Sequence, residues 1–134
     1  NLFRTLNAAM PTPTWQAEIV RAFQTWAAQT NVNVRVTGDN GRELGEAGPL
    51  YGSTLYGDVR IAARPLSDNV LAVSTPFDVF NSWSGEIVLN SNKLFARGNV
   101  SGRYDLYTVL LQETGHVLGV DNSPDTGSAM FTTY

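Results

Sequence analysis

The chain has 134 residues, 43% of them hydrophobic and 16% charged, which predicts one globular domain over residues 1–134 rather than a disordered segment. A net charge of −3 with scattered basic residues gives no reason to expect a nucleic-acid partner, and no apolar stretch reaches the roughly 18 residues that a membrane span requires. Zero cysteines exclude disulfides and thiolate metal sites, and a single histidine, His116, excludes a three-histidine metal site.

Two helices are predicted from apolar residues that recur at helical spacing. The first covers Pro11–Thr30, where threonine and proline suit a helix start and Glu18 lies early enough for the helix dipole to favour an acid. The second covers Tyr104–Leu118 and ends at Gly119, a residue type suited to a left-handed stop. The expected apolar face of the first helix comprises Trp15, Ile19, Val20, Ala22, Phe23, Trp26 and Ala27.

Four short segments between the helices are predicted to be strands. Asn31–Val36 alternates strictly between apolar and polar residues, and Asp58–Ala63, Val70–Ser74 and Gly85–Asn90 are apolar runs bounded by turn residues. A glycine-rich stretch over Thr37–Thr54 and a second stretch over residues 91–103 are predicted to be loops. The order of helix, strands and helix predicts an α+β or mixed layer with helices on one side of a sheet.

The second predicted helix carries a pattern typical of zinc peptidases. Gln112 and His116 are four residues apart and share one helix face. Zinc peptidases use this spacing for two imidazoles, with a glutamate after the first one acting on the metal-bound water, and here that glutamate is Glu113. The helix then ends at Gly119, and the chain turns back to offer a third ligand position at Asn122.

This pattern extends into a resemblance to a known family. The segment Asp105–Tyr134 resembles the metzincin signature, and specifically its matrixin branch, whose helix carries His-Glu-x-x-His-x-x-Gly-x-x-His. Other matrixin elements have counterparts in the same order: the long helix, the third strand, the substrate-aligning edge strand, the following strand and the methionine turn resemble residues 15–26, 57–61, 70–73, 85–90 and 128–130.

The resemblance implies a metzincin fold of the α+β class. We therefore expect a twisted, mixed, mostly parallel sheet with an antiparallel edge strand, on which the long N-terminal helix and the active-site helix pack. It also implies a secreted or extracellular monomer that binds zinc and a peptide or protein substrate, with no nucleic-acid or membrane partner.

The resemblance assigns a role to each motif position. Glu113 matches the catalytic glutamate, Gln112, His116 and Asn122 match the three metal ligands, and Met130 matches the methionine turn. The positions that match the substrate-binding residues are Val70, Leu71, Ala72, Val73 and Tyr134.

The sequence also departs from the matrixin pattern. Gln112 and Asn122 stand where matrixins have ligand histidines, and Val73 and Val88 stand where the family has histidines for a structural zinc, so no structural zinc is expected. Matrixins have a proline and an aromatic residue in the segment after the methionine turn, and this chain keeps the aromatic residue as Tyr134 but lacks the proline. Residues 1–134 also lack a counterpart of the family's final helix, and the strand before the long helix is abbreviated or absent.

These substitutions predict a weak or absent catalytic zinc. A neutral amide oxygen is a poor zinc donor compared with imidazole, which leaves His116 as the sole good ligand. Without the metal there is no acidified water, and Glu113 has nothing to deprotonate. We expect Gln112, His116 and Asn122 to hydrogen-bond to one another or to a water in the metal position.

Several alternatives stay open. The chain is a pseudopeptidase that binds peptide or protein without cutting it, an active zinc endopeptidase with unusual ligands, or a structural module of a larger secreted protein. A rearranged site could combine His116 with Asp121 or Asp125, although turn residues are the simpler interpretation of both aspartates. Matrixin loops often hold calcium, and the residues here that could do so are Asp39, Asn40 and Glu43, although a solvated loop is the simpler interpretation.

Overall fold

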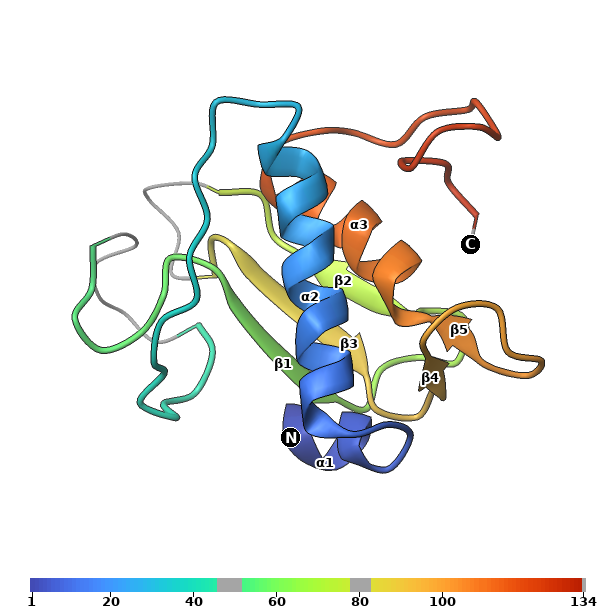
Figure 1. The fold of residues 1–134 in the computed structure, drawn as a ribbon, viewed down its shortest axis with the longest axis horizontal. Coiled ribbons are helices and arrows are strands. Elements are labelled where there is room, and N and C mark those ends of the chain that lie inside the picture. The colour runs from blue at the N-terminus through green and yellow to red at the C-terminus, as the bar shows by residue number, and fades with distance from the viewer. Residues whose placement is uncertain (46–51, 78–82, 134) are drawn as a thin grey trace.

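The computed structural model describes residues 1–45, 52–77 and 83–133 (Figure 1). Helices and strands follow one another as α1 (Leu2–Asn7), α2 (Thr12–Ala27), β1 (Arg60–Arg64), β2 (Ala72–Ser74), β3 (Glu86–Asn90), β4 (Phe95–Ala96), β5 (Tyr104–Asp105) and α3 (Leu106–Val117). Within these ranges no helix is both long and apolar enough to cross a bilayer.

The main sheet has the order β1-β3-β2. β1 runs parallel to β3, with Arg60 opposite Glu86, whereas β2 runs antiparallel to β3, with Ala72 opposite Leu89. A second, two-stranded parallel sheet joins β4 to β5. The mixed sheet with an antiparallel strand at its edge confirms the predicted α+β fold class.

The two long helices pack along each other, and α3 also lies against β2 and β3. In Figure 1, α2 crosses in front of the sheet with α3 beside it. The indole Nε1 of Trp26 on α2 donates to Leu111 O on α3 at 2.8 Å, which fixes the helix pair in register. The largest apolar side chains that are fully buried in this core are Leu6, Ile87, Leu89, Phe95, Leu106, Val109, Leu110 and Val117.

Local periodicity located both long helices and the three strands of the main sheet, but one predicted strand was wrong. Asn31–Val36 forms no strand and is exposed along its whole length. Alternating valines stabilise a strand only through a ladder partner and a face to pack on, and this segment pairs with no strand in the described ranges. Conversely, the short helix α1 and the β4–β5 pairing were not predicted, and α3 begins at Leu106, where the Asp105 carboxylate caps it by accepting from Thr108 N.

Glu18 lies early in α2, as its place in the sequence indicates, but its burial was not predicted. Its side chain is 2% exposed. A buried carboxylate requires charged partners, and Glu18 has Arg21 Nη2 at 3.0 Å and Arg97 Nε at 2.9 Å. The second contact ties α2 to the segment that follows β4.

The Asn90 side chain hydrogen-bonds to the backbone of the segment that leads into the edge strand β2. Its fully buried amide donates to Ser67 O at 3.0 Å and to Val70 O at 2.7 Å, and its Oδ1 accepts from the backbone N–H groups of Leu66 and Asn92. All four hydrogen-bonding positions of an asparagine side chain are therefore used. The end of β3 thereby holds the turn that leads into β2.

Replacing Asn90 with alanine is expected to destabilise the protein by about 3 kcal/mol, because several buried backbone groups lose their partners. The free energy of unfolding from urea titration measures this effect. Asn92→Ala is the matched control, since Asn92 is exposed and its side chain makes only a 3.4 Å contact. Equal losses in the two variants would contradict an organising role for Asn90.

Candidate functional site

The motif helix α3 presents its three motif residues at different depths. Gln112 and Glu113 are buried, whereas His116 is half-buried one turn later. The helix ends as predicted, because Gly119 has a φ of +86° and its N–H donates to His116 O. The backbone then reverses, and Asn122 lies exposed beyond the turn.

The two amides at the expected ligand positions lie together. Gln112 Nε2 donates to Asn122 Oδ1 at 3.4 Å and to Phe131 O at 2.8 Å. The first and third ligand positions are thus joined by a hydrogen bond, in line with the expectation from sequence. The stronger contact, to a backbone carbonyl beyond Met130, had no signal in the sequence.

His116 has a different partner from the one expected. Its Nδ1 lies 2.9 Å from Val120 O, and because a carbonyl only accepts, Nδ1 carries the proton. This contact orients the ring as second-sphere carbonyls orient metal-binding histidines, with Nε2 as the remaining acceptor. The structure therefore brings Gln112 and Asn122 together but pairs His116 with the helix terminus.

Glu113 is engaged by the edge strand. Its Oε2 accepts a hydrogen bond from Ser74 Oγ at 2.6 Å. Ser74 and Ala72 lie on the inward face of β2, whereas Val73 points outward, so strand alternation alone places the Ser74 hydroxyl toward α3. Ser74 was not among the predicted site residues, because its only signal was this inward register position.

The methionine turn is present and packed beneath α3. Met130 is buried, its N–H donates to Ser128 Oγ at 3.0 Å, and its carbonyl accepts from Ser123 N at 2.7 Å. An added Cβ at Gly115 would lie 2.3 Å from Met130 Sδ and 2.7 Å from Trp26 Cζ2. Glycine at this position allows the turn to approach the helix.

β2 is an edge strand, as predicted for the substrate-aligning segment, although it begins at Ala72. Asn90 N donates to Leu71 O, and Thr75 N donates to Glu86 O. By the alternation of a strand, the backbone groups of Ala72 and Ser74 therefore face the free edge. Val73 is 42% exposed there. The remaining predicted substrate contact, Tyr134, lies outside the described residues.

The other positions considered for a metal are two valines and two aspartates in a turn. Val73 and Val88, which match the structural-zinc positions, lie opposite each other across β2 and β3, and valine has no donor atom. Asp121 and Asp125 accept from Asn122 N and Gly127 N, as turn residues do. Across the described ranges, no group of three or more His, Asp or Glu residues is arranged to hold a metal ion.

Two of the three loop residues considered for calcium, Asp39 and Asn40, have side-chain oxygens that accept hydrogen bonds from the protein. Asp39 forms a 2.8 Å ion pair with Arg60 Nε, and this hydrogen bond holds the pKa of the Asp39 carboxyl below its usual value. Asn40 Oδ1 accepts from Arg42 N, and Glu43 contributes its carbonyl to Arg60 Nη1. Nearby, the buried Glu86 accepts from Gly45 N at 2.8 Å.

The geometry and the sequence pattern agree with a comparison against protein families, in which the matrixin model matches residues 2–134. The chain belongs to the matrixin family. Matrixins are zinc-dependent metallopeptidases that are typically secreted. Comparison with curated proteins finds no match to this matrixin.

The residues at the matrixin metal position do not fit a catalytic zinc. Such a site requires three imidazole or carboxylate donors and a water, whereas here one imidazole is accompanied by two amides. The Gln112 amide nitrogen donates to two oxygen acceptors, and the remaining amide oxygen is a poorer zinc ligand than imidazole. The neighbouring carboxylate of Glu113 is held by Ser74.

Gly115→Ala is expected to destabilise this matrixin by about 1–3 kcal/mol through overpacking, although alanine favours a helix over glycine by about 1 kcal/mol. Denaturant unfolding measures the change. Gly38→Ala is the control, since an added Cβ at Gly38 meets no atom within 4 Å. Combining Gly115→Ala with Met130→Ala should cost less than the sum of the single changes, and strict additivity would show that Met130 is not the obstacle.

Glu86→Gln is expected to stabilise the protein at neutral pH. Burial raises the pKa of Glu86 above 4.5, despite the opposing charges of Arg60 and Arg64. A raised folded-state pKa means that ionisation costs stability as the pH rises from the unfolded to the folded value. Glutamine keeps the acceptor for Gly45 without this cost.

Thermal unfolding from about pH 4 to pH 8 tests this prediction. The gain in Glu86→Gln should be present at about pH 7.5 and disappear near pH 4, where the wild-type carboxyl is protonated in both states. Glu43→Gln is the control, because Glu43 is exposed. A gain that does not change with pH would contradict the ionic explanation.

Proposed function

We propose that this matrixin is a pseudopeptidase, which binds extended peptide or protein segments along β2 and does not cleave them. The hydrogen bonds of Gln112 to Asn122 and Phe131 carry the first part of this proposal. They join the first and third ligand positions directly, so the site is held together by the chain's own amides. A metal at this position would gain only one imidazole, because the other two ligand positions offer amide oxygens.

The position of Glu113 supports the same conclusion. In a zinc peptidase this carboxylate accepts a proton from metal-bound water. Here it is buried and accepts a 2.6 Å hydrogen bond from Ser74, which links α3 to the edge strand. The carboxylate therefore has a structural partner in the fold, and we assign it no catalytic step.

The binding part of the proposal depends on the free edge of β2. Backbone N–H and C=O groups on an edge strand can pair with an extended peptide, which gains main-chain hydrogen bonds by strand addition. Ala72 and Ser74 offer these groups, and the exposed Val73 offers an apolar contact beside them. An extracellular location fits the family, and peptide or protein segments are the partners that this edge suits.

One observation favours an active zinc endopeptidase as a second candidate. His116 is oriented by Val120 O in the manner of a ligand histidine, and Met130 keeps its place beneath the helix. The framework of the site is therefore retained apart from two donors. Restoring histidine at positions 112 and 122 tests whether the absence of these two ligands is the only obstacle to zinc binding and cleavage.

The double substitution Gln112→His with Asn122→His is expected to bind one zinc per chain and to gain peptide cleavage of at least about a hundredfold over the wild type. Metal content by mass spectrometry and cleavage of a quenched fluorescent peptide measure the two effects. Adding Glu113→Gln to the pair should keep zinc and lose cleavage. Chelator-sensitive cleavage by the wild type would overturn the pseudopeptidase proposal.

Binding is tested by titrating the ¹⁵N-labelled wild type with reduced, carboxymethylated casein as an extended polypeptide. Amide shifts are expected at Ala72 and Ser74, and Val73→Lys should weaken binding by about tenfold. Val100→Lys is the matched control, because Val100 is also exposed but lies far from β2 in sequence. Unchanged spectra on titration would favour a structural module of a larger protein.

A further inference from the structure

Arg60 is a charged residue in a buried position. It is the first residue of β1 and its side chain is only 8% exposed. A guanidinium removed from water destabilises the fold unless a negative charge compensates it and its N–H donors have acceptors. The groups that accept hydrogen bonds from Arg60 therefore indicate the structural role of this buried charge.

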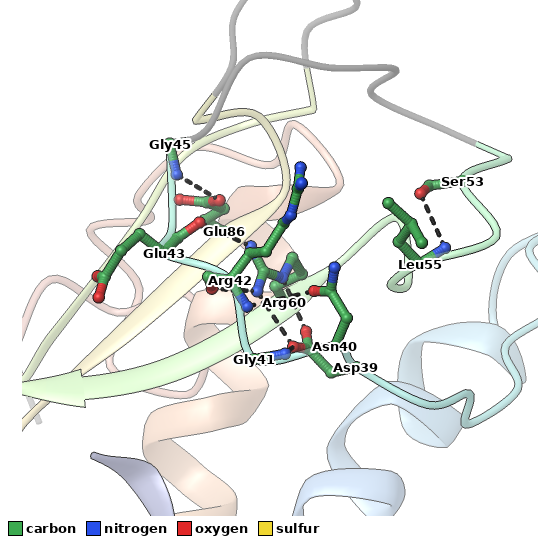
Figure 2. Close-up of polar contacts among 10 residues, drawn as sticks. All are labelled: Asp39, Asn40, Gly41, Arg42, Glu43, Gly45, Ser53, Leu55, Arg60 and Glu86. Atoms are coloured by element: carbon green, nitrogen blue, oxygen red, sulfur yellow. Dashed lines mark hydrogen bonds and ion pairs between the residues drawn. The ribbon is translucent and has the colours of Figure 1, made fainter.

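Four oxygen atoms accept hydrogen bonds from the guanidinium, and all four belong to the loop over residues 39–45 (Figure 2). Nε donates to Asp39 Oδ2 at 2.8 Å and Nη2 to Asp39 Oδ1 at 3.1 Å, so the carboxylate is held by both oxygens. Nη2 also donates to Arg42 O at 2.6 Å, and Nη1 to Glu43 O at 3.0 Å. The Tyr56 ring lies 4.6 Å from Cζ and adds a cation–π contact.

This set of acceptors resembles the ligands of a metal ion. Two carboxylate oxygens and two backbone carbonyls accept from three nitrogens of one cation, and calcium sites in proteins are built from oxygens of these kinds. We propose that Arg60 is the resident cation of the 39–45 loop: its guanidinium supplies the positive charge that the loop oxygens surround, and it fastens the loop to β1 without metal. This proposal is independent of the pseudopeptidase function.

The loop is shaped locally around this cation. Asp39 Oδ1 accepts from Gly41 N at 2.7 Å, and Asn40 Oδ1 accepts from Arg42 N at 3.2 Å. Gly41 has a φ of +77°, a conformation that glycine adopts without strain. These tight turns direct the carbonyls of residues 42 and 43 toward the guanidinium, while the paired charges keep the pKa of Arg60 raised and that of Asp39 lowered.

The far end of the loop is fixed to the next strand. Gly45 N donates to Glu86 Oε1 on β3, and Glu86 sits opposite Arg60 in the parallel ladder. An added Cβ at Gly45 would lie 2.2 Å from the Trp83 ring, so the loop contacts this indole closely. Asp39 and Glu86 are thus two acids on either side of one resident cation, whereas a divalent ion would have to displace Arg60 to reach them.

Trypsin provides a direct measurement, because the peptide bond after Arg42 has its carbonyl bound to Arg60. We expect cleavage after Arg42 in the wild type to be slow and equally slow in calcium and in chelator. Arg60→Met should be cleaved at this bond at least about tenfold faster, since the loop loses its anchor. It should also lower the unfolding midpoint by roughly 5–10 °C.

Two further variants keep the test decisive. Arg35→Met removes an exposed arginine and should leave cleavage after Arg42 unchanged. Asp39→Asn keeps the side-chain shape on the half-exposed partner, so it should fold even if Arg60→Met does not, and it should be cleaved several-fold faster than the wild type. The proposal is overturned if chelator accelerates cleavage of the wild type several-fold, if calcium slows it, or if Asp39→Asn and folded Arg60→Met are cleaved at the wild-type rate.

Discussion

The close approach of Met130 and Trp26 to Gly115 is the contact on which the motif region depends. It brings α2, α3 and the methionine turn together at a point where an added Cβ would lie 2.3 Å from Met130 Sδ and 2.7 Å from Trp26 Cζ2. The packing needs no ion, because it uses a sulfur, an indole and a helix backbone. Trp26 adds a hydrogen bond to Leu111 O from the same indole. The family's framework around the metal position is therefore kept by apolar packing even where its ligand residues have changed.

Local periodicity was sufficient to predict the two long helices and the three strands of the main sheet. The two long helices follow from spacing and terminal residues, and the strands of the main sheet follow from apolar runs between turns. Asn31–Val36 shows the limit of prediction from periodicity. Its apolar and polar residues alternate strictly, but it forms no strand, because a strand requires a neighbouring strand to pair with. Glu18 shows a second limit, because its burial depends on Arg97, which is distant in sequence.

The position of the candidate site and the hydrogen bond between Gln112 and Asn122 were predictable, but the other contacts of the site were not. Helical spacing and the turn after Gly119 placed Gln112, His116 and Asn122 in one region, as the structure finds. Their partners include the backbone carbonyls of Phe131 and Val120, which have no residue-type signature. Ser74 was also not predicted, because it belongs to no motif. Its role follows from its hydrogen bond to Glu113 on the neighbouring helix, which only the structure shows.

The arginine inside the 39–45 loop changes how that part of the molecule relates to its surroundings. A bound ion is in exchange with solution, and its occupancy falls when the free concentration drops below its dissociation constant. A cation attached through the covalent chain has a fixed effective concentration at its acceptors that dilution does not lower. On the proposal that Arg60 is the resident cation, the attachment of the loop does not depend on the calcium concentration of its surroundings. Acid remains able to loosen it, through protonation of Asp39.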